Sequence, residues 1–229
     1  MTSLSLSSTI GSNSGAHLTS TTTISVPQPA AYRSCSLHLH FTLPPSIFVD
    51  QYELANYQAQ YMFKHWGTSN LELPVSAVSA EGSALLLNVT QPTEGSTSVN
   101  VAVPMHARYD IVAESSAVLY REALLHQPKG FFACSSSSSS PRGVASFVPD
   151  LRTEFMAYFD LAVTKFVEIP PARGAAAHDT IRLPVGNLSH LFTVELGTAL
   201  CIIGLFFYLS HVSYTTWRRL QSNPRQKTE

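Results

Sequence analysis

Charged side chains are scarce in this chain. Only 13% of its 229 residues are Asp, Glu, Lys or Arg, about half of the roughly 25% that is usual in soluble domains, whereas 45% are hydrophobic. A freely diffusing soluble protein is therefore not expected, and an apolar segment must account for the imbalance. The formal net charge is −1 and no cluster of five or six basic residues occurs, so the sequence lacks the electrostatic footprint of nucleic-acid binding. We expect no nucleic-acid partner.

Cysteine is rare as well. Cys35, Cys134 and Cys201 are too scattered to supply the close ligand pairs of a structural zinc site. His38 and His40 share a strand face that could present two imidazoles to a metal, but no Cys, Asp or Glu lies nearby in the sequence to complete a site. A solvated strand face is the favoured interpretation, and we expect neither a metal nor a cofactor.

Familiar catalytic motifs are missing from the sequence, which contains no GxSxG, no HExxH, no P-loop and no Asp-x-Asp pair. The segment 104–109 does gather an imidazole, a guanidinium and a phenol in His106, Arg108 and Tyr109, a set that suits an active site. No nucleophile or paired carboxylate accompanies them. We therefore interpret the segment as a hydrogen-bonded strand end and expect no catalytic residues.

Two segments are dominated by small polar residues. Residues 1–30 contain no charged side chain and are rich in Ser and Thr, and they show neither the basic region nor the continuous apolar run of a secretory signal. We expect residues 1–33 to be disordered. Ser135 to Ser140 form an uninterrupted serine run, closed by Pro141-Arg142-Gly143. Such a run buries no apolar surface and predicts a flexible loop insertion at residues 135–143.

Between these segments the hydrophobic pattern indicates β-strands. Leu37, Leu39 and Phe41 alternate with His38 and His40 before Pro44-Pro45 ends the run. Similar short runs follow at residues 71–78, 84–89, 99–103, 117–120, 155–166 and 180–185. Residues 50–66 lack clean alternation and predict a helix or an extended crossing segment. The pattern predicts a mainly β domain over residues 34–187, an antiparallel sandwich or barrel.

The apolar segment lies near the C-terminus. Residues 196–214 carry no formal charge, and with their flank from Leu191 they are long enough to cross a hydrocarbon core of about 30 Å. We predict a transmembrane helix over residues 191–214. Arg218, Arg219, Arg225 and Lys227 follow it, which favours a cytosolic tail at residues 215–229 and a β-rich domain in the lumen. This basic tail also distinguishes the segment from a GPI-attachment signal, whose apolar tail ends the chain.

A luminal domain would be open to two modifications. Asn88-Val89-Thr90 and Asn187-Leu188-Ser189 are N-glycosylation sequons, and Asn88 is the better candidate because Asn187 is only a few residues from the predicted membrane helix. Cys35 and Cys134 either form one disulfide across most of the β-domain or remain two buried thiols. The luminal topology slightly favours the disulfide.

The predicted membrane helix carries a regular pattern of small and polar residues. Gly197, Cys201, Gly204, Tyr208 and His211 recur at spacings of four, three, four and three, which places them on one helix face. Helices approach each other closely in lipid along such stripes, so the pattern suggests a membrane partner. The alternative is that small residues are simply common in membrane helices.

Four sequence blocks resemble the PIG-X family in order and spacing. They lie at residues 43–54 (LPPSIFVDQYEL), 71–74 (LELP), 101–109 (VAVPMHARY) and 128–134 (PKGFFAC). The FVD-x-YEL block together with the VP-x-H-x-RY block is the specific part of the likeness, and residues 183–186 (LPVG) are similar to the fungal form. The resemblance covers residues 37–134 and, more loosely, residues 183–212.

The resemblance implies a non-catalytic subunit of GPI mannosyltransferase I. Such a subunit is a single-pass protein of the endoplasmic reticulum membrane that binds and stabilises the catalytic subunit, PIG-M. That enzyme transfers the first mannose from dolichol-phosphate mannose to the GPI precursor. The matched motif residues then become candidates for fold maintenance or partner contact: Asp50, Tyr52, Glu53, Pro104, His106, Arg108 and Tyr109.

Two other functions share parts of this organisation. A cell-surface adhesion or receptor-like β-domain on a single anchor has the same topology but would be exported to the plasma membrane. A tail-anchored protein would instead keep the β-domain in the cytosol.

Overall fold

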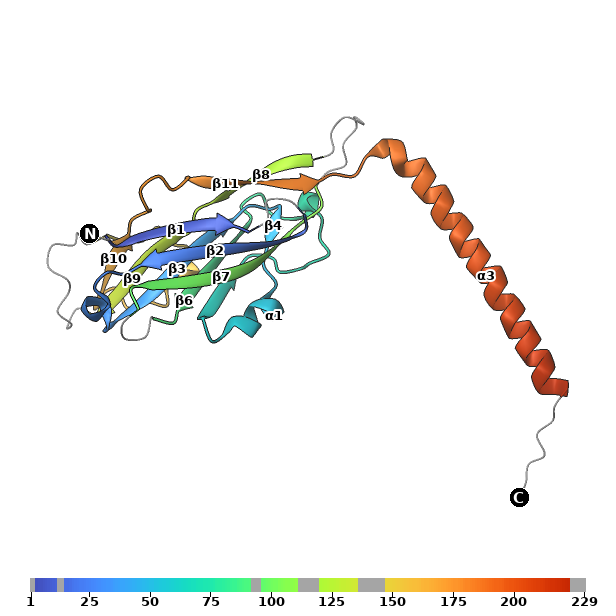
Figure 1. Cartoon of the computed structure of the whole chain (residues 1–229), viewed down its shortest axis with the longest axis horizontal. Helices are drawn as coiled ribbons and strands as arrows, with labels where there is room; N and C mark the ends of the chain where they lie inside the picture. The colour runs from blue at the N-terminus through green and yellow to red at the C-terminus, as the bar shows by residue number, and fades with distance from the viewer. Residues whose placement is uncertain (1–2, 12–14, 92–95, 111–119, 136–146, 223–229) are drawn as a thin grey trace, which may run out of the picture. The chain divides into compact units, whose positions relative to one another are not determined.

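The computed structural model describes residues 3–11, 15–91, 96–110, 120–135 and 147–222 (Figure 1). The chain forms two compact units. The first, made of residues 1–111 and 119–186, contains the β-strands. The second, whose described residues are 187–222, contains the long C-terminal helix.

The described strands are β1 (Ser5–Ile10), β2 (His17–Ser25), β3 (Cys35–Leu43), β4 (Ile47–Phe48), β5 (Tyr61–Trp66), β6 (Ser83–Val89), β7 (Ser98–Ala107), β8 (Tyr120–His126), β9 (Lys129–Ser135), β10 (Thr164–Ile169) and β11 (His178–Pro184). The α-helices are α1 (Gln51–Leu54), α2 (Thr153–Met156) and α3 (Leu191–Ser222), and the 3-10 turns are η1 (Pro29–Tyr32), η2 (Ala55–Tyr57), η3 (Val75–Ala77) and η4 (Leu188–His190).

The strands form three sheets, with the orders β1-β2-β7-β4, β10-β9-β3-β6-β5 and β11-β8. Every strand pair within these sheets is antiparallel. The main core contains alternate side chains of both larger sheets, such as Ile24 and Val103 from the four-stranded sheet and Leu39 and Leu87 from the five-stranded sheet. The predicted mainly β, antiparallel, sandwich-like class with one C-terminal helix is therefore confirmed.

The five-stranded sheet is buried on its second face as well. Phe155 of α2 packs there with Leu86, Phe131 and Phe166 in a separate apolar cluster. His38 and His40 lie on this face, and each is only 6% exposed. The prediction of a solvated histidine face was therefore wrong, because the segment around α2 covers the sheet where the alternation of β3 indicated solvent.

The described residues of the N-terminal segment, 3–11 and 15–33, contain β1, β2 and η1, contrary to the prediction of disorder over residues 1–33. β1 and β2 pair along their length, and β2 also pairs with β7. The inward faces of β1 and β2 carry Ser8, Ser20 and Thr22 beside apolar residues. The Ser8 hydroxyl lies 2.9 Å from that of Ser20 and accepts a 3.1 Å hydrogen bond from Thr22. These side chains satisfy one another, so a polar sequence forms a buried sheet face.

Of the remaining strand predictions, some agree with the structure and others do not. Residues 84–89, 99–103 and 180–184 lie in β6, β7 and β11 as predicted. Residues 71–78 form turns and η3 instead of a strand, and residues 155–166 split between α2 and β10. Residues 50–66 comprise α1, η2 and the strand β5. Residues 117–119 and 136–146, which include most of the predicted serine insertion, lie outside the described residues.

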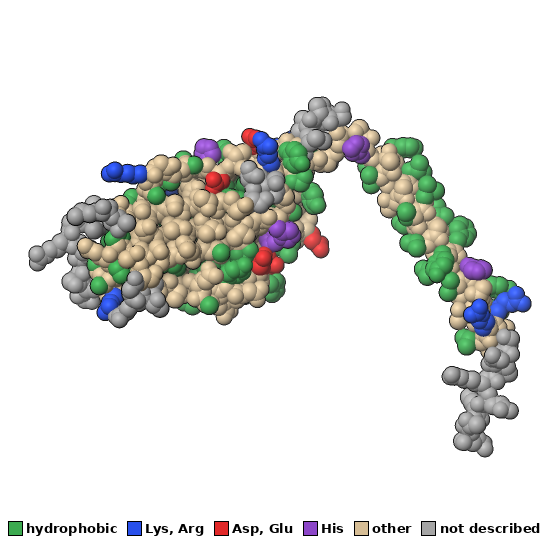
Figure 2. Space-filling view, viewed as in Figure 1, with side chains coloured by type: hydrophobic (Ala, Val, Ile, Leu, Met, Phe, Trp, Pro, Cys, Tyr) green, Lys and Arg blue, Asp and Glu red, His purple; other side chains and the backbone are tan. Residues whose placement is uncertain are grey.

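The second unit contains α3. Figure 2 shows hydrophobic side chains along the length of this helix and basic side chains near its C-terminal end. The segment Leu188–Gln221 is long and apolar enough to cross a membrane. Among the residues that the structure describes, it is the one helix with these properties. Arg218 and Arg219 lie within the last turns of α3, whereas Arg225 and Lys227 lie outside the described residues.

Candidate partner-binding site

Two of the sequence blocks meet at one end of the four-stranded sheet. β4 pairs with the last residues of β7, so that Ile47 lies opposite Ala107 and Phe48 opposite His106. The chain then turns into α1, whose first turn is capped by Asp50, because the Asp50 carboxylate accepts a 2.9 Å hydrogen bond from the Tyr52 backbone N–H. The cap fixes where the side chains of α1 lie against β7.

His106 is the centre of this junction. Its Nε2 lies 2.6 Å from the Glu53 carboxylate of α1, which joins α1 to β7. The imidazole stacks on the Phe48 ring, with centroids 5.2 Å apart, and meets the edge of the His17 ring at 4.7 Å. Two segments that are distant from His106 in the sequence, residues 48–53 and β2, therefore contact this one side chain.

Arg108 binds a third sequence block, residues 71–74, to the same junction. Its side chain is 4% exposed, and Nη1 donates hydrogen bonds to the carbonyl oxygens of Asn70 at 2.6 Å and Leu73 at 2.9 Å. The guanidinium lies over the Phe48 ring, 4.3 Å from its centroid. Burial lowers the pKa of Arg108 from its usual value. Arg108 therefore holds the loop at residues 71–74 at the end of β7 through these two hydrogen bonds.

Tyr52 and Tyr109 have the opposite character. Their side chains are 87% and 75% exposed. The main chain of Tyr109 is engaged, since its carbonyl oxygen accepts a hydrogen bond from the Val75 N–H. Exposed tyrosines on a rigid base are typical of protein interfaces, because the ring offers a large contact area at a small entropic cost.

The motif residues therefore separate into two groups. Glu53, His106 and Arg108 bind other parts of the same chain, and Pro104 is buried within β7 opposite Thr19. Tyr52 and Tyr109 remain available for an outside partner. Phe48 was not among the predicted site residues, although it lies inside the FVD-x-YEL block, and its contacts with His106 and Arg108 require the fold to become visible. The junction therefore presents two exposed tyrosine rings beside side chains that contact other parts of the same chain.

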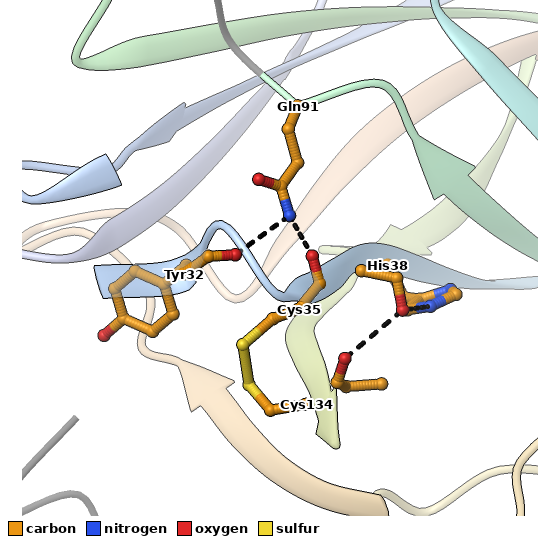
Figure 3. Close-up of a disulfide and its surroundings, with 7 residues drawn as sticks. Tyr32, Cys35, His38, Gln91 and Cys134 are labelled. Atoms are coloured by element: carbon orange, nitrogen blue, oxygen red, sulfur yellow. Dashed lines mark hydrogen bonds between the residues drawn. A yellow bond between two sulfur atoms is a disulfide. The ribbon is translucent and has the colours of Figure 1, made fainter. Parts of the chain in front are cut away.

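A disulfide joins Cys35 of β3 to Cys134 of β9, which lie opposite each other in the register of the two strands (Figure 3). The Gln91 carboxamide donates hydrogen bonds to the carbonyl oxygens of Cys35 and Tyr32. The ring of Tyr32 stacks on Phe132, 4.2 Å between centroids. The disulfide therefore lies within an ordered end of the five-stranded sheet.

The two sequons differ in their surroundings. Asn88 lies on β6 between β3 and β5 and is partly buried. Asn187 precedes η4, where its side-chain oxygen accepts a 2.8 Å hydrogen bond from the Ser189 N–H. The side chain of Asn187 is therefore engaged as a cap, whereas that of Asn88 stands in a wall of a groove described below.

The two buried histidines have surroundings that disfavour a charged imidazole. Burial lowers the pKa of His38 and of His40 to about 4, and for His40 the positive charge of Lys129 adds to this effect. His38 Nε2 lies 2.8 Å from the Ser36 hydroxyl. Across the described ranges, no group of three or more His, Cys, Asp or Glu side chains is placed to hold a metal ion.

On α3 the predicted stripe lies on an exposed helix face. Gly197, Cys201, Gly204 and Tyr208 all fall within the continuous helix, and none is buried against another part of the chain. A Cβ atom added at Gly197 or Gly204 would meet nothing within 4 Å. The two glycines therefore leave space on the helix surface that no other described part of this chain fills.

Comparison with known proteins identifies the chain's relatives. A family model described as PIG-X / PBN1 matches residues 13–214. Protein pbn1 of Aspergillus fumigatus is 30% identical over 225 residues, which cover 86% of this chain and 45% of that protein. Protein pbn1 of Aspergillus oryzae is 28% identical (91% of this chain, 42% of that protein), and protein pbn1 of Schizosaccharomyces pombe is 24% identical (76% and 49%). The chain thus spans less than half the length of these relatives. The extent of the family match shows that the chain belongs to the PIG-X / PBN1 family.

Proposed function

We propose that this chain is an accessory, non-catalytic subunit in GPI-anchor biosynthesis. It binds and stabilises the catalytic subunit of GPI mannosyltransferase I, the PIG-M type enzyme that adds the first mannose to the GPI precursor. The observation that carries the proposal is membership of the PIG-X / PBN1 family across residues 13–214. The junction of the motif blocks supports it, because Glu53, His106 and Arg108 contact other parts of the chain while the rings of Tyr52 and Tyr109 face outward.

The proposed location is the endoplasmic reticulum membrane, with the β-unit in the lumen and the C-terminus in the cytosol. The Cys35 to Cys134 disulfide supports a luminal β-unit, because disulfides persist in oxidising compartments. Arg218 and Arg219 at the end of α3 support a cytosolic C-terminus by the positive-inside rule.

Two surfaces are proposed to contact the catalytic subunit. In the lumen, Tyr52 and Tyr109 offer exposed rings on a rigid junction. In the membrane, the face of α3 with Gly197 and Gly204 admits close approach of another helix. Two surfaces are expected, since a polar contact between helices in lipid contributes only about 1 kcal/mol and a luminal interface adds area.

Deletion of the gene tests the function as a whole. We expect the steady-state level of the catalytic subunit to fall and the unmannosylated GPI precursor to accumulate. Immunoblotting and lipid analysis of the same cells measure both. Normal amounts of both the enzyme and the mannosylated product would refute the proposal.

Substitution of the exposed tyrosines tests the luminal surface. The double variant Tyr52→Ala, Tyr109→Ala should reduce co-purification with the catalytic subunit while leaving the thermal unfolding of the isolated chain unchanged, because both rings are exposed. Tyr158→Ala is the matched control, since that ring is also exposed, at 57%, but lies at the five-stranded sheet. Equal co-purification of the double variant and the control would exclude this surface.

A pair of small-to-large substitutions tests the membrane surface. Gly204→Leu fills the glycine face and should weaken co-purification, whereas Ala199→Leu adds similar bulk about half a turn away and should not. An equal effect of both variants would indicate a general disturbance of the helix and would exclude the stripe as the contact.

A further inference from the structure

A groove runs across the outer face of the five-stranded sheet. It has a volume of about 450 Å³ and is open to solvent on one side. β3 contributes Ser36 and His38, β5 contributes Met62 and Lys64, and the segment after α2 contributes Tyr158 and Phe159. The volume lies within the range of small-ligand sites, roughly 300 to 1,000 Å³. None of the residues of the proposed partner-binding surface lies in it.

Asn88 of the first sequon stands in the wall of this groove. In the strand register Asn88 lies directly opposite His38 of β3 on one side and Met62 of β5 on the other. All three side chains therefore share the outer face of the sheet. A group attached to the Asn88 carboxamide begins inside the groove, between the histidine and the methionine.

The lining has the mixed character of a sugar site. Tyr158 and Phe159 offer apolar ring surface, which suits the C–H face of a pyranose. Ser36, Lys64 and the His38 imidazole supply hydrogen-bonding groups for hydroxyl and acetamido substituents. His38 is only 6% exposed, and its Nε2 lies 2.8 Å from the Ser36 hydroxyl, so these two polar groups lie together in the groove lining. Met62, by contrast, is 66% exposed, which leaves apolar surface uncovered.

We propose that the first N-acetylglucosamine of an N-linked glycan on Asn88 occupies this groove and covers Met62 and Phe159. The attachment forms a bond between Asn88 Nδ2 and the anomeric carbon of an oligosaccharide, breaks the bond from that carbon to its lipid-diphosphate carrier, and releases one amide proton. The carrier-linked oligosaccharide is the co-substrate. The inference rests on the luminal orientation in the proposed function, and it adds that the glycan is packed against the fold.

The first experiment asks whether Asn88 is modified. Glycosidase treatment of the full chain expressed in its host should shift the wild type and Thr90→Ser on a gel, and Thr90→Ala should lose that glycan, because only the last variant destroys the sequon at Asn88. Glu72→Thr serves as an orientation reporter, since it completes a new sequon at Asn70 in an exposed loop. An unmodified Asn88 would overturn the inference. In that case, a glycan on Asn70 would leave the luminal orientation standing, and its absence would remove the orientation as well.

The second experiment asks whether the sugar lies in the groove. The purified full-length Glu72→Thr chain in detergent, folded and carrying both glycans, is digested with a peptide N-glycosidase that cleaves the bond between asparagine and sugar. We expect release from Asn88 to be roughly tenfold slower than release from Asn70, because cleavage requires the sugar to leave the groove. Adding Tyr158→Ala removes one wall and should accelerate release at Asn88 only. Equal release rates at the two sites would overturn the inference.

Discussion

β2 and β3 are neighbouring strands in the chain that belong to opposite sheets of the same core, and they differ in how polarity relates to burial. β3 carries Leu37, Leu39 and Phe41 on its core face, with His38 and His40 on the other. β2 carries Leu18 and Ile24 on its core face, with Ser20 and Thr22 between them at 1% and 0% exposure. Both faces of β3 are buried, and half of the core face of β2 is polar.

The difference shows that contacts with other segments of the chain, and not side-chain type alone, determine which face of a strand is buried. The hydroxyls of β2 are buried because Ser8 on β1 satisfies them. The imidazoles of β3 are buried because Phe155 and Phe159 of the α2 segment lie against them, with ring centroids 5.8 Å and 5.1 Å away. In each case the covering group comes from another segment of the chain.

The largest expected difference between the two strands is covalent. β3 is tied to β9 by the Cys35 to Cys134 disulfide across a separation of 99 residues, and β2 has no such link. The double variant Cys35→Ala, Cys134→Ala should lower the free energy of unfolding of the β-unit by about 4 kcal/mol, mainly by freeing the unfolded chain. Urea titration of the full chain in detergent measures this. Trp217→Phe as background leaves Trp66 as the only tryptophan to report on the β-unit.

Cys201→Ala is the control for that variant, because Cys201 is a free and exposed thiol on α3. It should leave the transition midpoint unchanged. A loss below about 1 kcal/mol in the double variant would mean that the disulfide does little to constrain the unfolded chain.

The next effect compares the two core faces directly. Leu39→Ala removes a fully buried side chain from β3 and should cost about 3 kcal/mol, because the transfer energy is lost and a cavity remains. Thr22→Val in β2 keeps the volume and removes one hydroxyl donor, so it should cost less than about 1 kcal/mol. The same urea titration ranks them, and a larger loss for Thr22→Val would contradict the idea that apolar packing dominates the core.

A smaller effect isolates the hydroxyl cluster of Ser8, Ser20 and Thr22. Ser8→Ala should cost about 1 to 2 kcal/mol, since the other two hydroxyls are left buried without their partner. The triple variant Ser8→Ala, Ser20→Ala, Thr22→Val removes every member and should be less destabilising than Ser8→Ala alone. Additive losses in the triple variant would show that the hydroxyls do not act as a set.

The sequence predicted the elements whose own residues show a regular apolar pattern. β3, β6, β7 and β11 carry apolar periodicity, and α3 carries an uncharged apolar run, so each was found. The observed β7 and α3 extend past their predicted ends at residues 103 and 214, to Ala107 and Ser222. β1 and β2 were missed because their apolar residues are separated by Ser and Thr. These hydroxyl side chains are buried only where they hydrogen-bond to one another across the two strands. The segment at residues 71–78 is apolar, but it is held as a loop by hydrogen bonds from Arg108 to the carbonyl oxygens of Asn70 and Leu73. A local sequence pattern cannot predict these long-range contacts.

The candidate site shows the same limit. The sequence blocks identified Glu53, His106 and Arg108, yet their separation of more than 50 positions hides the hydrogen bond between Glu53 and His106. Whether a motif residue faces inward or outward also depends on the fold. Tyr52 and Glu53 are adjacent in the sequence, and only the structure separates the exposed ring from the engaged carboxylate.

The smallest expected effect concerns the outer face of β3 at acid pH. Burial lowers the pKa of both His38 and His40 from 6.5 to about 4, with Lys129 further lowering and Asp150 raising that of His40. Between pH 6.5 and about 4, the two histidines are protonated in the unfolded chain but neutral in the folded chain. The free energy of unfolding therefore falls as the pH drops through this window. By pH 5.5 each histidine should cost roughly 1 kcal/mol relative to pH 7.5. His40→Phe should remove about half of this histidine contribution to the loss, and it should cost little at pH 7.5, because neither ring nitrogen of His40 has a partner among the described residues. Urea titrations at the two pH values measure both, and an unchanged pH dependence in His40→Phe would show that the outer face of β3 is open to water after all.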